Sequence, residues 1–153
     1  MAFQVIPFEL QYAKHFRDLN LQWIQEKFVV EPKDRTLLEN CKKYIIETGG
    51  HIFFAEYNGD IAGCFAFIKL NNEVYELGKM AVDPNYQGIK IGQKLLDFAI
   101  NFAKKEGWHR LVLYSSTQLD TALHIYRKYG FKEVPIDPDS QYIRSDIKME
   151  LSL

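Results

Sequence analysis

The chain has 153 residues, of which 47% are hydrophobic and 25% are charged, and its formal net charge is −1. This size and composition predict one ordinary domain, residues 1–153, with a buried core, and the balanced charge argues against a dedicated nucleic-acid binder, which usually carries a basic excess. The N-terminus lacks the pattern of a signal peptide and no apolar run is long enough to span a membrane, so we expect a cytoplasmic protein without a membrane partner.

Apolar periodicity predicts strands and helices over the first half of the chain. Residues 2–7 alternate in polarity and predict a strand, whereas the apolar residues of 12–27 recur at helical spacing. A second helix is expected over 32–50, because proline suits the first turn of a helix and the glycine pair at its end would stop it. Asn58-Gly59 lies between two apolar runs and is the strongest short signal for a β-hairpin.

The second half continues the alternation of strands and helices. We expect a strand over 73–82, a helix over 91–107, a strand over 108–116, a short helix over 119–129, and strands over 131–136 and 142–151. The strand 108–116 has a nearly continuous apolar centre, which predicts burial on both faces. The resulting order is β-α-α-β-β-β-α-β-α-β-β, an α/β domain with a mixed sheet covered by helices.

Two glycines stand directly before the helix over 91–107, in the stretch DPNYQGIKIGQKLL at residues 83–96. The first amides of a helix have no partner within it, and the helix dipole adds roughly half a positive charge there. Gly88 and Gly92 remove side chains that would keep a ligand from the backbone, and Lys90 adds positive charge. The loop therefore suits a phosphate group, although the bare pattern also fits an ordinary connection. It is neither a Walker A motif nor a dinucleotide fingerprint.

Residues 87–92 read QGIKIG and residues 122–131 read ALHIYRKYGF. This pair resembles the phosphate loop, Gln/Arg-x-x-Gly-x-Gly/Ala, and the fourth-helix signature of the GNAT family, the acetyl-CoA-dependent N-acetyltransferases. Gln87 and Gly92 match the loop, whereas Lys90 replaces its middle glycine. The likeness covers nearly the whole chain in element order and is sharpest over 73–131.

The resemblance implies that acetyl-CoA (coenzyme A) is the cofactor and that its pantetheine arm lies like an added strand in a splayed gap between the fourth and fifth strands. Main-chain groups of the fourth strand would bind the arm, and the loop amides would bind the pyrophosphate. Ser116 falls where many members carry an asparagine that binds the arm. The cofactor-binding residues implied in this way are Met80, Ala81, Val82, Gln87, Gly88, Ile89, Lys90, Ile91, Gly92, Gln93 and Ser116.

Glu76 is the candidate general base, because the histone-acetylating branch of the family carries its base at a matching position and a carboxylate can take the proton of an acceptor amine. It lies six residues before Val82, so strand periodicity is expected to put both on one face. The resemblance also makes Tyr126 the candidate acid for the leaving thiolate, whereas helix spacing alone favours a packing role. Asp146, expected in the last strand, is a second carboxylate that could hold the ammonium.

The resemblance places the acceptor between the loop that joins the first two helices and the last two strands. Aromatic rings and carboxylates there suit a cationic small-molecule amine or a peptide amine, and they suit an ordinary solvated rim equally. The oligomeric state is left open, a homodimer included. The candidate acceptor-binding residues are Phe28, Glu31, Asp34, Arg35, Tyr142, Arg144 and Asp146.

The two cysteines, Cys41 and Cys64, lie in apolar surroundings outside these motifs, and the four histidines are scattered singly. We therefore expect reduced thiols, with a disulfide as the less favoured alternative, and no metal site. The sequence as a whole predicts an N-acetyltransferase that moves an acetyl group from acetyl-CoA to a primary amine by direct attack. The alternative is a non-catalytic acyl-CoA-binding sensor or interaction module on the same fold, which would not need the pair Glu76 and Tyr126. An RNA-associated protein is disfavoured by the charge.

Overall fold

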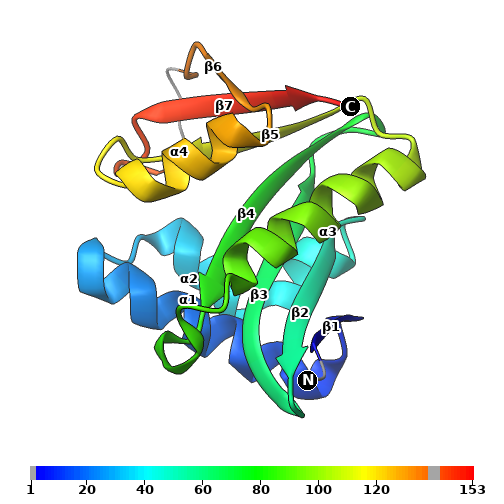
Figure 1. Cartoon of the computed structure of the whole chain (residues 1–153), viewed down its shortest axis with the longest axis vertical. Helices are drawn as coiled ribbons and strands as arrows, with labels where there is room; N and C mark the ends of the chain where they lie inside the picture. The colour runs from blue at the N-terminus through cyan, green and yellow to red at the C-terminus, as the bar shows by residue number, and fades with distance from the viewer. Residues whose placement is uncertain (1–2, 138–141) are drawn as a thin grey trace.

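The computed structural model describes residues 3–137 and 142–153, and within them the central feature is a seven-stranded mixed sheet of order β1-β2-β3-β4-β5-β7-β6. Its strands are β1 (Phe3–Pro7), β2 (His51–Tyr57), β3 (Asp60–Lys69), β4 (Val74–Val82), β5 (Arg110–Ser115), β6 (Lys132–Val134) and β7 (Ile147–Ser152). Neighbouring strands run antiparallel except for β4 and β5, which are parallel (Figure 1).

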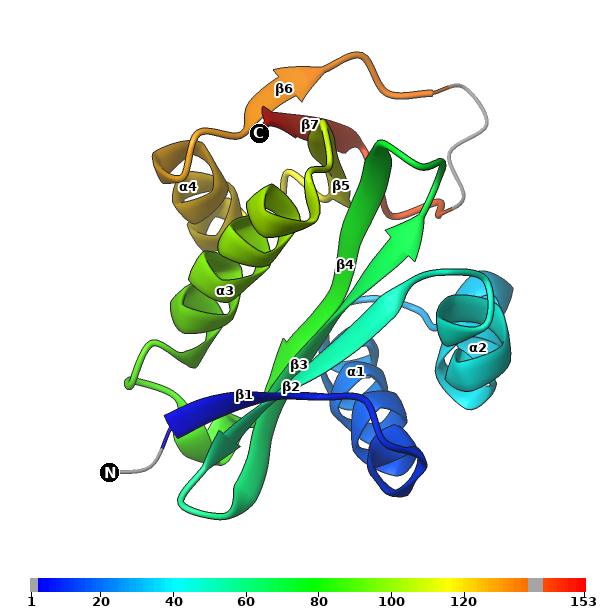
Figure 2. The same cartoon turned by 90° about the vertical axis from the view of Figure 1, so that its right-hand side faces the viewer.

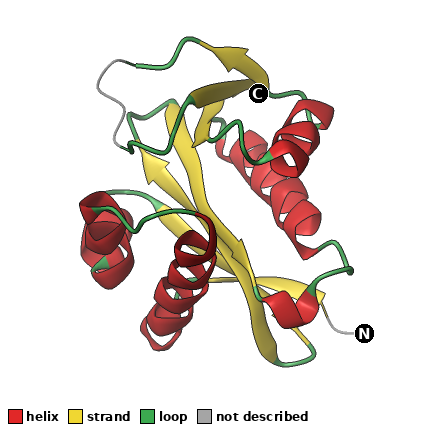
Figure 3. Ribbon diagram, turned by 90° about the vertical axis from the view of Figure 1, so that its left-hand side faces the viewer, coloured by secondary structure: helices red, strands yellow, loops and turns green. Residues whose placement is uncertain are grey.

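Helices cover both faces of this sheet. They are α1 (Ala13–Lys27), α2 (Pro32–Glu39), α3 (Ile91–Glu106) and α4 (Asp120–Lys128), with shorter helical turns η1 (Leu10–Tyr12), η2 (Lys42–Ile46) and η3 (Pro84–Tyr86). Figure 2 shows α3 and α4 on one face and α1 and α2 on the other, and Figure 3 gives the opposite view. Each face has its own cluster of buried apolar side chains, so two cores sandwich the sheet.

Helix α3 follows local rules that the sequence makes visible. Its buried residues include Ile91, Leu95 and Ala99, which recur every fourth position and form one apolar face. The helix ends at Gly107, whose φ of 76° is the left-handed conformation that glycine adopts easily. Asn58 and Gly59 also have positive φ, which confirms the predicted hairpin turn between β2 and β3.

Two predicted elements differ from the structure. The helix expected over 32–50 is interrupted, because Asn40 leaves helical geometry at φ −131° and a separate turn, η2, follows it. Asparagine is a weak helix former whose side chain competes with the backbone for hydrogen bonds. The last strand begins at Ile147, not at residue 142, because the N–H groups of Ile143 and Arg144 donate to the Glu31 carboxylate instead of to a neighbouring strand.

A bulge interrupts the pairing of β4 with β3. Residue 66 of β3 pairs with residue 78 and residue 64 pairs with residue 81, so β4 holds one residue more than its partner over this stretch. Lys79 lies in the bulge with a φ of 53°, a left-handed conformation that is uncommon for a side chain other than glycine.

The bulge reverses the alternation of side chains along β4. Glu76 pairs with Ile68, which packs on the side of α1 and α2. Val82 instead packs against the cluster that contains the buried face of α3. The expectation that Glu76 and Val82 share one face is therefore wrong. Side chains alternate between the two faces along a strand, so one inserted residue moves the side chains after it to the opposite face.

The sheet splays between β4 and β5. Their parallel ladder runs only from the pair Val74–Arg110 to the pair Glu76–Val112, although β4 continues to Val82 and β5 continues to Ser115. Beyond Glu76 the two strands separate, as Figure 1 shows, which confirms the splayed central sheet. The edge of β4 that faces this gap has backbone groups without a partner in β5.

Cys41 and Cys64 are buried free thiols. Burial raises the pKa of Cys64 to about 12, so this thiol stays protonated at neutral pH. Over residues 3–137 and 142–153, none of the helices has both the length and the apolar character needed to cross a bilayer.

Candidate functional site

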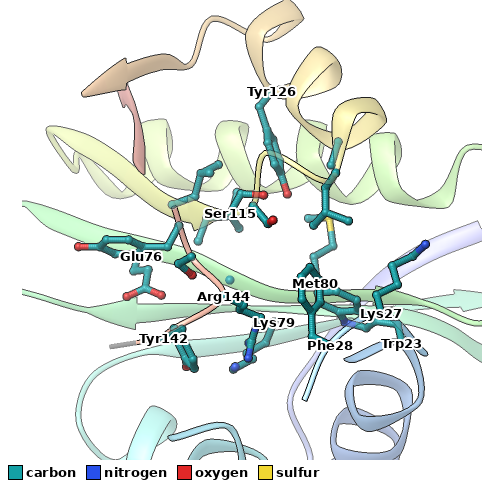
Figure 4. A pocket seen from close by; sticks show the side chains of 18 residues that line it. Trp23, Lys27, Phe28, Glu76, Lys79, Met80, Ser115, Tyr126, Tyr142 and Arg144 are labelled. Atoms are coloured by element: carbon teal, nitrogen blue, oxygen red, sulfur yellow. The ribbon is translucent and has the colours of Figure 1, made fainter. Parts of the chain in front are cut away.

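A cavity of about 280 Å³ opens where β4 and β5 separate (Figure 4). It is bounded by residues 76–80 of β4, by residues 113–116 at the end of β5, and by Ala122 and Tyr126 of α4. The C-terminal end of α1 and the segment before β7 close it from the other side. Segments from four separate parts of the sequence therefore meet where the sheet splays, since the end of β5 and α4 are neighbours in the chain.

Glu76 lies on the wall formed by β4, at the last residue that β4 pairs with β5. The residue is only 7% exposed. Burial raises the pKa of Glu76 to about 6, and the charges of Lys79, Lys33 and Lys148 oppose part of that increase. A carboxylate with a pKa slightly below neutral is ionised at pH 7 and still basic enough to accept a proton, so its position and its pKa suit a general base.

Tyr126 reaches the cavity from α4, and Figure 4 shows its hydroxyl pointing into it. The ring packs edge-on against Phe131, with ring centroids 5.8 Å apart. Burial raises the pKa of Tyr126, so the phenol stays protonated and can donate a proton or a hydrogen bond at neutral pH. Tyr126 can pack in the core and also act in the cavity, because its ring contacts Phe131 and its hydroxyl points into the cavity.

A buried ion-pair network borders the cavity. Asp34 of α2 is fully buried and accepts hydrogen bonds from Lys79 Nζ at 2.6 Å and from two nitrogens of Arg144, each at 2.7 Å. Arg144 Nη1 also lies 3.3 Å from Glu31. Burial alone would raise the pKa of Asp34, but the hydrogen bonds from Arg144 and the charge of Lys79 outweigh it and lower the pKa to about 2. Asp34 is therefore ionised throughout the physiological range.

The network explains which predicted acceptor residues reach the cavity. Phe28, Tyr142 and Arg144 line it. The carboxylates of Glu31 and Asp34 do not, because Arg144 and Lys79 already hold them. Their role in binding an acceptor stays a prediction, and in this structure both carboxylates are paired with cations.

Two further predicted acceptor residues lie outside the cavity. Arg35 pairs with Glu39 on the surface at 3.3 Å. Asp146 precedes β7 and accepts hydrogen bonds from the Thr117 N–H at 2.8 Å and from the Thr117 hydroxyl at 2.7 Å. The carboxylate of Asp146 thus fixes the turn after β5, and its role toward an acceptor ammonium stays a prediction.

The loop before α3 lies apart from the cavity lining, and it is well formed. Lys90 has φ 61° and ψ 35°, the left-handed conformation that a glycine adopts without strain. The replacement of the family's middle glycine by lysine therefore preserves the turn. Lys90 makes no side-chain capping bond to α3, so the first amides of the helix are free of a side-chain cap. A Cβ atom on Gly92 would lie 3.9 Å from Val82, so the surface over these amides is open.

We expect Lys90→Gly to raise the free energy of unfolding relative to Lys90→Ala by about 1 kcal/mol, because a left-handed L-residue carries roughly 1–2 kcal/mol of strain that glycine avoids. Both variants remove the same ammonium, so their difference isolates the backbone. Urea unfolding followed by circular dichroism measures it. Equal stability of the two variants would mean that residue 90 leaves the left-handed region in solution.

The remaining cofactor candidates divide between the cavity and the core. Met80 and Ser116 line the cavity, and the Ser116 hydroxyl accepts the N–H of Gln118 at 3.2 Å. The side chains of Ala81 and Val82 pack in the cores on opposite faces of the sheet. This leaves only their backbone for a ligand, as the resemblance implies.

Three basic or aromatic residues of the cavity were not predicted, namely Trp23, Lys27 and Lys79. The sequence did contain a signal for Lys79, because a lysine within a mainly apolar strand usually needs an anion as its partner when it is buried. Trp23 and Lys27 carried none, since both fit an ordinary amphipathic helix.

Comparison with known proteins agrees with this geometry. The model of the Acetyltransferase (GNAT) family matches residues 16–131. A GNAT-family acetyltransferase from Staphylococcus aureus has a similar structure, with a TM-score of 0.86, 24% identity and coverage of 99% of both chains. The PaiA N-acetyltransferase from Thermoplasma acidophilum, solved in complex with coenzyme A, has a TM-score of 0.78, 19% identity and coverage of 100% of both chains.

Curated sequences add further relatives. An uncharacterized N-acetyltransferase from Methanocaldococcus jannaschii is 36% identical over 88 residues, which make up 53% of this chain and 38% of that protein. The match covers about two fifths of the length of this relative and of a probable N-acetyltransferase 14 from Xenopus tropicalis. Because the family model covers most of the sequence, from residue 16 to residue 131, and the sheet has the expected splay, this chain belongs to the GNAT acetyltransferase family.

Proposed function

We propose that the chain transfers the acetyl group of acetyl-CoA to a primary amine. The observation that carries this proposal is that Glu76 and Tyr126 line the same cavity, from different elements, at the point where β4 and β5 separate. One side chain suits a proton acceptor and the other a proton donor, which are the two groups that a direct transfer needs. A protein that only bound acyl-CoA would need neither.

The gap beside β4 fits the arm of the cofactor. The β4 backbone beyond Glu76 has no partner in β5, and an extended ligand can satisfy such an edge as an added strand would. The open amides at the start of α3, beside Gly92, suit the pyrophosphate. When bound, acetyl-CoA supplies the activated acetyl group, and the residues of this chain orient it and handle the protons.

The proton steps follow from the two side chains. The acceptor nitrogen forms a bond to the acetyl carbonyl carbon, and Glu76, directly or through a water, takes the proton that this nitrogen loses. The carbon–sulfur bond breaks with its electron pair on sulfur, and Tyr126 donates a proton to that sulfur. The products are the N-acetylated amine and CoA with a free thiol. Glu76 then releases its proton to solvent, and Tyr126 regains one.

The proposed binding of the pyrophosphate by the loop before α3 gives a prediction for Gly92. Gly92→Glu should weaken binding of CoA by at least about 10-fold, because a carboxylate at the helix N-terminus repels the pyrophosphate from the positive end of the dipole. The fold should keep its stability, since acidic residues are favourable in the first turn and the site has room for a side chain. Isothermal titration calorimetry with CoA measures the affinity.

Gly92→Gln is the matched control for bulk. We expect it to weaken CoA binding less than Gly92→Glu does, because it blocks the amides without adding charge. Unchanged affinity in both variants would show that the loop does not hold the pyrophosphate.

The proposed function is tested by the release of free thiol from acetyl-CoA in the presence of a panel of primary amines, with mass spectrometry of the acetylated product. Thiol release that depends on the amine supports the proposal. Tight binding of acetyl-CoA without transfer to any amine would favour the acyl-CoA-binding module. Failure to bind acetyl-CoA would reject both.

A further inference from the structure

Two cations line the same cavity as Glu76. Lys79 and Arg144 both line it, and their side chains are only 6% and 13% exposed. Among the described residues that line the cavity, Glu76 is the only carboxylate. The charges that an acceptor meets near the general base are therefore mainly positive.

The carboxylates of Asp34 and Glu31 already form ion pairs with these cations. Asp34 accepts from both Lys79 and Arg144, and Glu31 accepts from Arg144. The four charges balance one another, so no negative charge is left over to attract a polycation. A polyamine would bring a second ammonium toward Lys79 and Arg144 and find only Glu76 as a partner, which is unfavourable at short range.

The two cations also retain unused donors. A guanidinium has five N–H groups and an ammonium has three. Within the described part of the chain, Arg144 Nη1 donates to Glu31 and Asp34 and Nη2 donates to Asp34, whereas Lys79 donates once, to Asp34. The Tyr142 ring covers one side of both cations, each 4.5 Å from its centroid. The remaining N–H groups have no acceptor among the described residues.

We infer that the acceptor is a free amino acid, with its amine facing Glu76 and its carboxylate accepting hydrogen bonds from Lys79 and Arg144. This inference rests on the proposed function and names its substrate class. An amino acid is complementary to the site because it carries one positive and one negative group close together, opposite to one carboxylate and two cations. It differs from the cationic amine that the sequence suggested, because the sequence could not show that Asp34 and Glu31 were already paired.

A matched pair of acceptors tests the inference without relying on any variant. Phenylalanine and phenethylamine differ only in the carboxylate, and leucine and isoamylamine form a second pair. We expect kcat/KM for the amino acid of each pair to exceed that of its decarboxylated amine by roughly 10- to 100-fold, the usual effect of charge-assisted hydrogen bonds. Spermidine should be a poorer acceptor than either amino acid.

In Lys79→Asn, the ratio of kcat/KM for each amino acid to kcat/KM for its decarboxylated amine should fall to about 3 or less. The reason is that charge-assisted hydrogen bonds to the acceptor carboxylate are lost. Asparagine tolerates the left-handed backbone of residue 79, and Asp34 keeps its two bonds to Arg144. Lys90→Asn is the matched control, since it also replaces a left-handed lysine but lies in the loop before α3. We expect it to leave the preference unchanged, whatever its effect on acetyl-CoA affinity.

The outcomes separate this inference from the proposed function. Transfer to phenethylamine or spermidine as fast as to the amino acids would overturn the inference and leave the proposed function standing. Transfer to a peptide N-terminus but not to free amino acids would likewise overturn it. If Lys79→Asn still prefers amino acids over their decarboxylated amines, Lys79 does not bind the acceptor carboxylate. If no amine is acetylated at all, the proposed function itself fails.

Discussion

Glu76→Gln should lower turnover with an amine acceptor by roughly 10²-fold at neutral pH, since general-base catalysis typically contributes 10²–10⁴-fold. Glutamine keeps the size of the side chain and removes its basicity. The loss should shrink as pH rises, because more of the acceptor is then present as free amine and needs no base. A pH profile of kcat from pH 6 to pH 10, with a saturating acceptor, gives both the size and the slope of the effect.

Although Glu76→Gln should lower turnover, it should stabilise the fold relative to the wild type as pH rises. Burial raises the pKa of Glu76 from 4.5 to about 6 in the folded protein, so the folded state binds more protons than the unfolded state between these values. The wild type therefore loses stability as pH rises through this window, by about 2 kcal/mol at 1.36 kcal/mol per pKa unit. Glu76→Gln lacks this loss. The free energy of unfolding of the variant minus that of the wild type should therefore increase between pH 4 and pH 8.

Glu47→Gln provides the control, because Glu47 is exposed and remote from the cavity. Its turnover should match that of the wild type. A loss of turnover in Glu76→Gln that does not depend on pH, or no loss, would mean that Glu76 is not the base. A stability difference that stays constant from pH 4 to pH 8 would mean that the pKa of Glu76 is not raised by burial.

The parts of the fold that the sequence predicted depend on interactions between near neighbours. The turn at Asn58-Gly59 and the helix from Ile91 to Gly107 are set by backbone preferences and by apolar spacing within a few residues. The glycine loop before α3 was recognisable for the same reason. The resemblance to a known family then gave the splay between the fourth and fifth strands, which local periodicity does not contain.

The parts that the sequence did not predict depend on residues far apart in the chain. Asp34 meets Lys79 across 45 residues and Arg144 across 110, so no local pattern shows that these charges are paired. The bulge at Lys79 arises from how β4 pairs with β3, and it put Glu76 on the face opposite to that of Val82. Both features decide the electrostatics of the cavity, which is why the acceptor class inferred from the structure differs from the one expected from residue types alone.

The bulge also links these features to the cavity. By adding one residue, it turns the Lys79 side chain to the buried carboxylate of Asp34 and leaves the backbone of residues 78–80 on the cavity wall. Removing Asp34 would leave Lys79 buried without its partner and Arg144 with only Glu31, and breaking a buried ion pair in this way typically costs about 3–5 kcal/mol. For that reason the experiments on charge recognition substitute Lys79, whose loss leaves Asp34 paired with Arg144.

Tyr126→Phe should lower kcat by about 10- to 10³-fold, while acetyl-CoA affinity and thermal stability stay close to those of the wild type. A phenol near the sulfur donates its proton as negative charge develops on the leaving thiolate, so it acts on the transition state more than on the bound thioester. Phenylalanine keeps the ring that packs against Phe131 and deletes only the hydroxyl. Since a thiol is a good leaving group, the lower half of the range is expected.

Steady-state kinetics, calorimetry with acetyl-CoA and thermal melts together distinguish the roles of Tyr126. A fall in kcat with unchanged affinity is the signature of an interaction made only in the transition state. Tyr129→Phe is the control, because Tyr129 lies one turn further along, at the end of α4, and does not line the cavity; its turnover should match that of the wild type. If Tyr126→Phe instead loses several kcal/mol of stability and turns over normally, Tyr126 is a packing residue and another group must protonate the sulfur.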